Sequence, residues 1–110
     1  MLFHVVPVDE WTADVDRPYA PASLATEGFV HCSPDEPAAL AIADGLYRDV
    51  PDLLVLRIDE SGLGAEVRWE GSADMLFPHV YGPIERAAVT GVLWVRRDMD
   101  GHARELTPWA

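Results

Sequence analysis

At 110 residues the chain has the usual length of one domain, and we predict a single domain over residues 1–110. Hydrophobic residues make up 49% and charged residues 25%, the balance of a globular protein rather than of a disordered one. Nineteen acidic residues face eight basic ones, all of them arginine, and the net charge of −11 argues against nucleic-acid binding as the main function. With one cysteine, no signal peptide and no apolar run of about 20 residues, we expect a cytoplasmic protein that does not bind membranes.

The first third of the sequence predicts short strands separated by turns. Leu2–Val6 and Phe29–Cys32 are rich in the β-branched and aromatic residues that favour strands. Between them, Asp9–Val15 and Ala22–Glu27 predict short helical turns in a stretch that prolines and a glycine interrupt.

The clearest local signal predicts the start of the main helix. Ser33 has the hydroxyl of an N-cap, Pro34 suits the first helical position, and Glu36 lies three residues after Ser33, as a capping box requires. We therefore expect a helix over about 34–47, beginning at Ser33.

The second half of the sequence predicts mostly strands. Leu53–Ile58 is the most apolar segment and is expected in the middle of a sheet. Glu66–Glu70, the segment FPHVYGP at 77–83, Ala87–Arg96 and Ala103–Leu106 follow, with turn residues between them. The predicted fold class is α+β, with mostly β structure and one main helix.

Three of the four histidines lie in short strand-like segments: His4, His31 and His79. Successive side chains of a strand point to opposite faces, so each histidine shares a face with the residues two positions away. His79 thereby lies beside Phe77 and Tyr81, and His31 beside Phe29 and Ser33. Imidazoles next to aromatic rings suit a pocket that stacks a planar ligand and hydrogen-bonds its edge. Three satisfied structural histidines remain the alternative interpretation, and His102, at a turn, is expected on the solvated surface.

Other candidate residues surround these histidines. Glu70 ends the EVRWE strand just before the FPHVYG segment, where a carboxylate can reach a ligand, although an exposed strand-end glutamate is the alternative. Tyr19 lies between two prolines and can either overhang the pocket or anchor the loop. Cys32 should face away from His31 and pack in the core. Because no pair has the close spacing of a zinc motif, we predict no metal site.

Taken together, these segments resemble the small bacterial domain-of-unknown-function family 952. The resemblance runs in order through LFHVV, Trp11, YAPASLATEGFVHCS, LLVLRI, RWE and FPHVYGPI, and so covers nearly the whole chain. It implies a fold similar to that of the ADP-ribosyltransferases, in which two small, mostly antiparallel sheets form a cleft for NAD. It also implies a relation to the RNA 2′-phosphotransferases, but the arginine cluster that those enzymes use on phosphate has no equivalent beside these histidines.

The resemblance implies roles for several residues of this chain. By position, His4 would touch a ribose, Tyr19 or Tyr81 would stack on nicotinamide, and Glu70 would steady a developing oxocarbenium ion. His31 lies in a VHCS stretch similar to a VHLS-like stretch of the phosphotransferases, and we assign it with Glu70 to catalysis. The cofactor-binding set is His4, Tyr19, Ser33, His79 and Tyr81.

The functional hypothesis is a pocket for a nucleotide-like small molecule, NAD or an ADP-ribose derivative, with ADP-ribosyl transfer or NAD glycohydrolysis as its chemistry. The first alternative is a binding module that keeps the cleft without turnover. The second is a protein-interaction domain, which only the acidic surface suggests.

Overall fold

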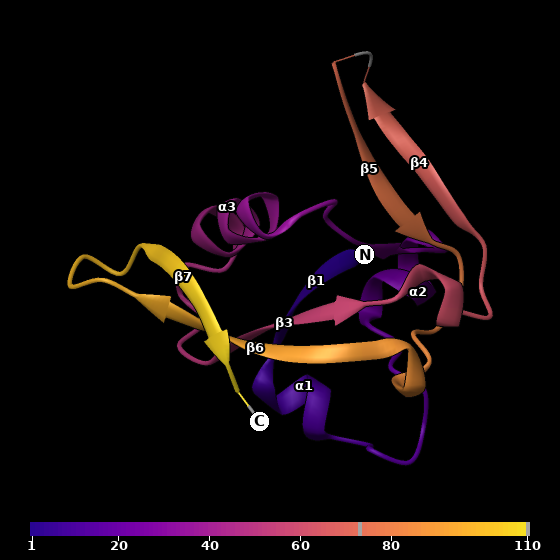
Figure 1. Ribbon diagram of the computed structural model, residues 1–110, viewed down its shortest axis with the longest axis horizontal. Helices are drawn as coiled ribbons and strands as arrows, with labels where there is room; N and C mark the ends of the chain where they lie inside the picture. The colour runs from indigo at the N-terminus through magenta and orange to yellow at the C-terminus, as the bar shows by residue number, and fades with distance from the viewer. Residues whose placement is uncertain (73, 110) are drawn as a thin grey trace.

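The computed structural model describes residues 1–72 and 74–109, and Figure 1 shows how their elements are arranged. The strands are β1 (Leu2–Pro7), β2 (Val30–His31), β3 (Leu53–Ile58), β4 (Val67–Ser72), β5 (Met75–Val80), β6 (Val89–Arg97) and β7 (Ala103–Pro108). The α-helices are α1 (Val8–Thr12), α2 (Ala22–Glu27) and α3 (Glu36–Leu46), and short 3₁₀ turns cover Glu60–Gly62 and Arg86–Ala88.

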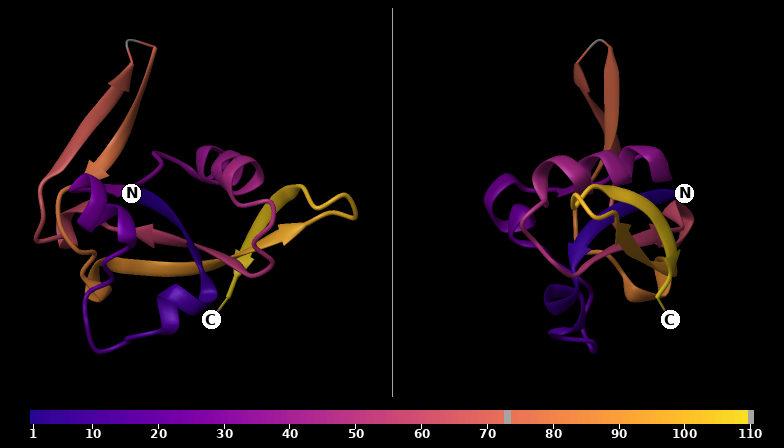
Figure 2. Two further views of the ribbon diagram at one scale, coloured as in Figure 1. Left: turned by 180° about the vertical axis from the view of Figure 1, so that it is seen from behind. Right: turned by 90° about the vertical axis from the view of Figure 1, so that its left-hand side faces the viewer.

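The strands form two antiparallel sheets, so the predicted α+β class with few helices is confirmed. The larger sheet has the order β1-β3-β6-β7, and β3 is internal, as the apolar LLVLRI segment predicts. The smaller sheet has the order β2-β5-β4, and its β4–β5 hairpin projects away from the larger sheet (Figures 1 and 2). No helix in the described part of the chain is long and apolar enough to cross a membrane.

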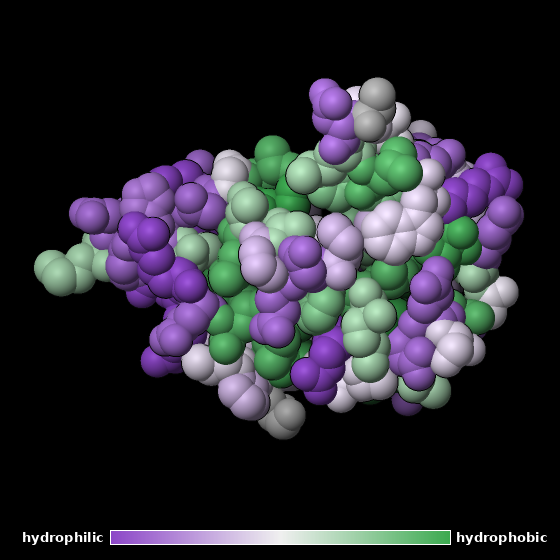
Figure 3. Space-filling view, turned by 45° about the horizontal axis from the view of Figure 1, so that its top comes forward, coloured by the Kyte–Doolittle hydropathy of each residue, from purple (hydrophilic) through white to green (hydrophobic). Residues whose placement is uncertain are grey.

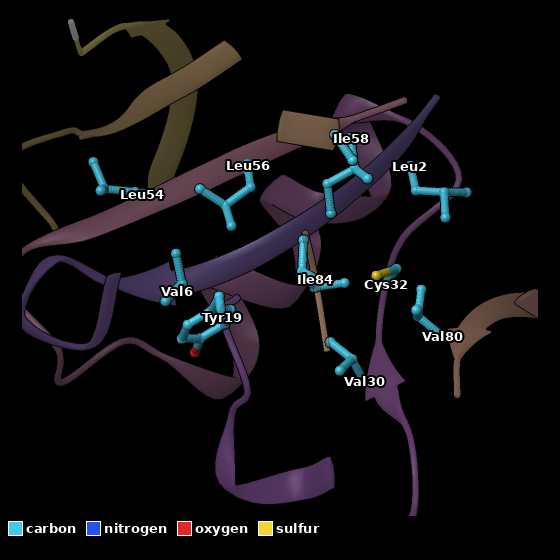
Figure 4. Packing of buried hydrophobic residues seen from close by; sticks show 11 residues of the cluster. Leu2, Val6, Tyr19, Val30, Cys32, Leu54, Leu56, Ile58, Val80 and Ile84 are labelled. Atoms are coloured by element: carbon cyan, nitrogen blue, oxygen red, sulfur yellow. The ribbon is translucent and has the colours of Figure 1, made fainter. Parts of the chain in front are cut away.

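Strand β1 is buried on both of its faces, which explains its apolar sequence. On one face, Leu2 and Val6 pack in a cluster with Val30 and Val80 of the smaller sheet (Figure 4). On the other face, Phe3 and Val5 pack against α3, in a cluster that includes Ala39. His4 lies between Leu2 and Val6 in the alternation, so its side chain points to the side of the smaller sheet.

The start of α3 differs from the sequence expectation. Its N-cap is Asp35, whose Oδ1 accepts a hydrogen bond from the backbone N–H of Ala38 at 2.8 Å, and the helix begins at Glu36. Ser33 is instead part of an antiparallel bridge with Phe3, through backbone hydrogen bonds of 2.9 and 2.6 Å. The prediction of Ser33 as the cap was therefore wrong, because a second capping residue lay two positions further along the chain.

Two isolated bridges tie the irregular segments to the sheets. Phe3 pairs with Ser33, which holds the chain after β2 along the outer edge of β1. Tyr19 pairs with Ile84 through two hydrogen bonds of 2.8 Å, which brings the proline-rich loop onto the core.

At the far end of the molecule, His102 is half-buried and its Nδ1 lies 3.1 Å from Asp44 of α3, so the expectation of a solvated surface position was wrong.

Candidate ligand-binding pocket

A pocket of about 440 Å³ opens beside the edge of β1, between the two sheets and α3. Its walls combine apolar side chains with a group of hydrogen-bonding side chains, as is usual for small-molecule sites. The lining residues are His4, Val5, Pro7, Glu10, Tyr19, Pro21, Ala22, Ser23, His31, Cys32, Ser33, Ile42, Leu46, Tyr47, Phe77 and His79. Figure 3 looks onto the side of α3 and the hairpin, where green hydrophobic side chains lie at the surface among purple hydrophilic ones.

The structure brings His4, His31 and His79 together at this pocket, although they come from three different strands. The rings of His31 and His79 lie edge to face with centroids 5.3 Å apart, since the two residues are directly paired in the β2–β5 ladder. Nδ1 of His4 lies 2.6 Å from the carbonyl oxygen of His31. The prediction that the three strand histidines converge on one cleft is therefore confirmed.

The hydrogen bond of His4 fixes its tautomer. A carbonyl oxygen can only accept, so Nδ1 carries the proton and donates it to His31. Burial lowers the pKa of His4 to about 4, which keeps the imidazole neutral at physiological pH. Nε2 is consequently an acceptor; it makes no hydrogen bond within the described part of the chain, yet it is not sealed from solvent. This acceptor is available to a ligand in the pocket.

Strand β1 contributes backbone groups as well as side chains. The N–H and C=O of Phe3 bond to Ser33 on the outer side of the strand, away from β3. Because these groups reverse direction at each residue of a strand, those of Val5 also point outward. Val5 lines the pocket, and no described residue makes a backbone hydrogen bond to it on this side. The N–H and C=O of Val5 thus have no partner among the described residues, and the pocket wall offers one donor and one acceptor.

Ser33 and Tyr19 complete the polar part of the pocket. Both residues are buried, and neither hydroxyl makes a hydrogen bond within the described part of the chain. Burial raises the pKa of the Tyr19 phenol, so this group remains a neutral hydroxyl. The ring of Tyr19 lies 5.7 Å from that of His4 and packs against Trp11, so it both anchors the loop and lines the pocket.

Glu70 and Tyr81 lie behind His79 and do not line the pocket. Oε1 of Glu70 accepts a hydrogen bond from the Tyr81 hydroxyl and another from Nδ1 of His79 at 3.0 Å. These bonds, with the Tyr81 bond the larger cause, lower the pKa of Glu70, so the group is ionised at neutral pH. Phe29 stacks on the ring of His79 with centroids 4.1 Å apart and so covers one of its faces. Glu70 therefore orients His79, and through it reaches the pocket.

A second carboxylate acts on His31. Nε2 of His31 lies 3.0 Å from Oε2 of Glu27, at the end of α2, and both side chains are about half exposed. The pocket rim therefore carries two imidazoles, each held by its own carboxylate. Fixing one ring nitrogen in this way sets the orientation of the other, as in many catalytic and ligand-binding histidines.

The charges around the pocket favour a neutral or cationic group inside it. Apart from histidine, Glu10 is the one charged residue among those that line it. Arg86 and Arg17 line a smaller neighbouring depression, but the guanidinium of Arg86 already donates to the carbonyl oxygens of Trp11, Asp14 and Arg17. A phosphate would find no free arginine inside this pocket.

Sequence reasoning missed several parts of the site. The free backbone groups of Val5 depend on where the chain leaves the edge of β1, and no sequence pattern indicates that position. Ile42 of α3 and Tyr47, which follows this helix, also line the pocket, and no sequence pattern marked them as ligand-binding residues. Glu27 could have been found from its spacing of four residues before His31, although that spacing alone carries little information.

The remaining reactive side chains do not suggest a metal or thiol centre. Within residues 1–72 and 74–109, no group of three or more histidine, cysteine or acidic side chains is arranged to hold a metal ion. Cys32 is buried in the core, as expected from its face of the strand, and burial raises its pKa to about 12. The thiol is therefore a packing group rather than a nucleophile.

Comparison with known proteins identifies the family and the fold of this chain, and it assigns no function to it. Residues 5–92 match the family described as "Protein of unknown function (DUF952)". Two crystal structures of protein CC0527 from Caulobacter crescentus, one of them a double mutant, are each 24% identical to this chain, with a TM-score of 0.70. Each alignment covers 94% of this chain and 92% of the other. No curated protein matches the sequence.

Proposed function

This chain belongs to the DUF952 family, and we propose that it binds a nucleotide-like small molecule, NAD or an ADP-ribose derivative, in the histidine-lined pocket. The proposal includes an ADP-ribosyltransferase-like fold. Its support is the pair of antiparallel sheets with a pocket at the edge of the first strand, together with the sequence resemblance.

The observation that carries the proposal is the polar array along β1. Val5 offers one N–H and one C=O, His4 offers an acceptor nitrogen, and Ser33 offers a hydroxyl, all at a pocket with mainly apolar walls. An N–H donor and a C=O acceptor side by side on one residue match the edge of a carboxamide or a nucleobase. Tyr19 and Phe77 supply aromatic surface for the ring that carries that edge.

The charge distribution indicates which end of such a ligand enters. Because no arginine is among the described residues that line the pocket, the diphosphate would remain at the mouth, in contact with water. The nicotinamide ring of NAD is cationic, and a pocket that contains Glu10 and neutral His4 accepts a cation more readily than an anion. The ring end of the ligand is therefore the buried end.

The chemistry we propose for this pocket is ADP-ribosyl transfer or NAD glycohydrolysis. The bond between nicotinamide and the ribose breaks, nicotinamide leaves with the bonding electrons, and positive charge develops on the ribose. The Glu70 carboxylate, through its charge, would stabilise that centre. His31, held by Glu27, would take the proton from the attacking water or other acceptor.

A binding module without turnover is the second candidate, and one observation favours it. Glu70 does not line the pocket, and its Oε1 is already engaged by His79 and Tyr81. In this case the carboxylate only orients His79, and the pocket holds its ligand without changing it.

The test is isothermal titration calorimetry with NAD, ADP-ribose and nicotinamide, followed by measurement of nicotinamide release. We expect NAD to bind, and we expect Ser33→Ala and Phe77→Ala to weaken binding. The matched control Ser61→Ala alters a serine that does not line the pocket and should bind like the wild type. Binding without release would support the second candidate, and failure of all three compounds to bind would refute the proposal.

A further inference from the structure

The outer edge of β4 is an open strand edge. The N–H of Tyr81 bonds to the carbonyl oxygen of Glu66, so the backbone of Glu66 is directed toward β5. Since backbone direction alternates along a strand, Arg68 and Glu70 also face β5, whereas Val67, Trp69 and Gly71 direct their N–H and C=O groups outward. The outward N–H and C=O groups of these three alternate residues can form hydrogen bonds with another strand.

Nothing in the described part of the chain covers this edge. Strand β4 is the last strand of its sheet, and the hairpin projects from the body in all three ribbon views (Figures 1 and 2). The strand sequence VRWEGS contains no proline or lysine, and its pairing with β5 shows no bulge, so of the usual protections of an edge it has only the charges of Arg68 and Glu70. The side chain of Trp69 is 46% exposed.

The sequence of β4 is complementary to itself in one register. When two copies pair antiparallel about Trp69, Arg68 of each copy lies opposite Glu70 of the other, and Val67 lies opposite Gly71. The two Trp69 side chains then form a cross-strand aromatic pair, and opposite charges face each other twice. Pairing about Arg68 would instead place Arg68 opposite Arg68 and Glu66 opposite Glu70, with like charges throughout.

We propose that a second copy of this chain pairs with the first through β4, antiparallel and centred on Trp69. The two smaller sheets then become one continuous sheet in the order β2-β5-β4-β4-β5-β2. Arg68 and Glu70 lie on the same face as His79 and Tyr81, so both copies present their Glu70–His79 pairs on one face of the joint sheet. This association does not depend on the proposed ligand.

The experiment is sedimentation equilibrium of the full chain, at about 0.15 M salt so that the repulsion between two net charges of −11 is screened beyond about 8 Å. We expect a reversible monomer–dimer equilibrium. Trp69→Pro removes an outward N–H and the aromatic pair, and should weaken association more than about tenfold. The matched control Trp109→Ala changes another exposed tryptophan on the larger-sheet side and should leave association unchanged.

Charge reversal tests the register. Arg68→Glu places two acids opposite each other, and Glu70→Arg places two arginines opposite each other, so each variant alone should associate about tenfold more weakly. Mixed together, the two variants restore both opposite-charge pairs and should form a heterodimer. A wild-type monomer up to about 1 mM, an unlimited assembly, or variants that associate alone but not more strongly when mixed would each overturn the proposal.

Discussion

The imidazole of His4 and the carbonyl oxygen of His31 are joined by a hydrogen bond of 2.6 Å, which links the first strand of the larger sheet to the first strand of the smaller one. The bond crosses 27 positions of the chain and forms one wall of the pocket. It requires a proton on Nδ1 and leaves Nε2 as an acceptor. His4 thus contributes both a contact between the two sheets and an acceptor to the pocket.

This arrangement makes stability depend on pH. Burial lowers the pKa of His4 to about 4 in the folded state, against 6.5 when unfolded, so the unfolded chain binds the extra proton first as the pH falls. Above pH 6.5 His4 is neutral in both states and does not lower the free energy of unfolding. Between pH 6.5 and 4 the unfolded chain takes up the proton first, which lowers the free energy of unfolding by roughly 3 kcal/mol. Urea denaturation across this range should show the loss. In His4→Gln that part of the pH dependence should disappear, and an unchanged profile would contradict the assignment.

The two polar residues before α3 should have separate effects. Asp35→Ala removes the oxygen that caps the helix and should cost about 1 kcal/mol of stability, measured by urea denaturation. Ser33→Ala removes a hydroxyl that caps nothing, so its cost should stay within about 0.5 kcal/mol while ligand affinity falls. Equal losses of stability from both substitutions would mean that Ser33 also takes part in capping.

Much of the fold could be predicted because its signals are local. The LLVLRI segment is a strand over the predicted residues, 53–58, and the ASLATE turn is the helix Ala22–Glu27, ended by Gly28 at a φ of 88°. The period of two also placed Phe29 and His31 on one face and Val30 on the other. The capping error arose because Ser33 and Asp35 both fit a cap, and only the bridge from Ser33 to Phe3 decides between them.

The site was harder to predict because it depends on pairing between distant strands. The three pocket histidines could be recognised as a set, but the sequence could not place Glu70 behind His79 rather than in the pocket wall. That placement follows from the β4–β5 register, in which Glu70 lies opposite Phe77. The ADP-ribosyltransferase-like fold and the NAD ligand remain proposals.

Arg86 is predicted to be structural rather than ligand-binding. Its guanidinium donates hydrogen bonds to one carbonyl oxygen of α1 and two of the loop before Tyr19, and it lies 4.2 Å from the ring centroid of Trp11. Lysine cannot reproduce this planar arrangement, so Arg86→Lys should lower the free energy of unfolding by about 2 kcal/mol. Arg17→Lys, at an exposed position of the same loop, should change it by less than about 0.5 kcal/mol. Similar stabilities for the two variants would refute this role.

Nucleic acids are not expected to be partners. A net charge of −11 repels a phosphate backbone, and binding driven by counterion release requires clustered positive charge. Electrophoretic mobility-shift assays with single-stranded and double-stranded DNA and RNA should show no micromolar complex at physiological salt. A complex of that affinity would contradict the prediction.

A substitution at Glu70 distinguishes the hypothesis of an enzyme from that of a binding module. If the pocket breaks the glycosidic bond of NAD, the charge of Glu70 acts mainly in the transition state, where positive charge develops. Glu70→Gln keeps the shape and some of the hydrogen bonding of the side chain and removes its charge. The affinity for NAD should therefore change little, while nicotinamide release should fall by roughly two to three orders of magnitude.

Binding has to be measured first, by calorimetry with NAD, and release second, with the same protein preparations. His31→Ala and His79→Ala should weaken binding, since both rings line the pocket. Glu105→Gln, on the exposed surface of β7, is the matched control and should leave both binding and release at wild-type levels. A wild-type protein that binds NAD and releases none would identify a binding module. Full activity in Glu70→Gln would show instead that the catalytic charge lies elsewhere, because the orientation of His79 does not require a charged partner.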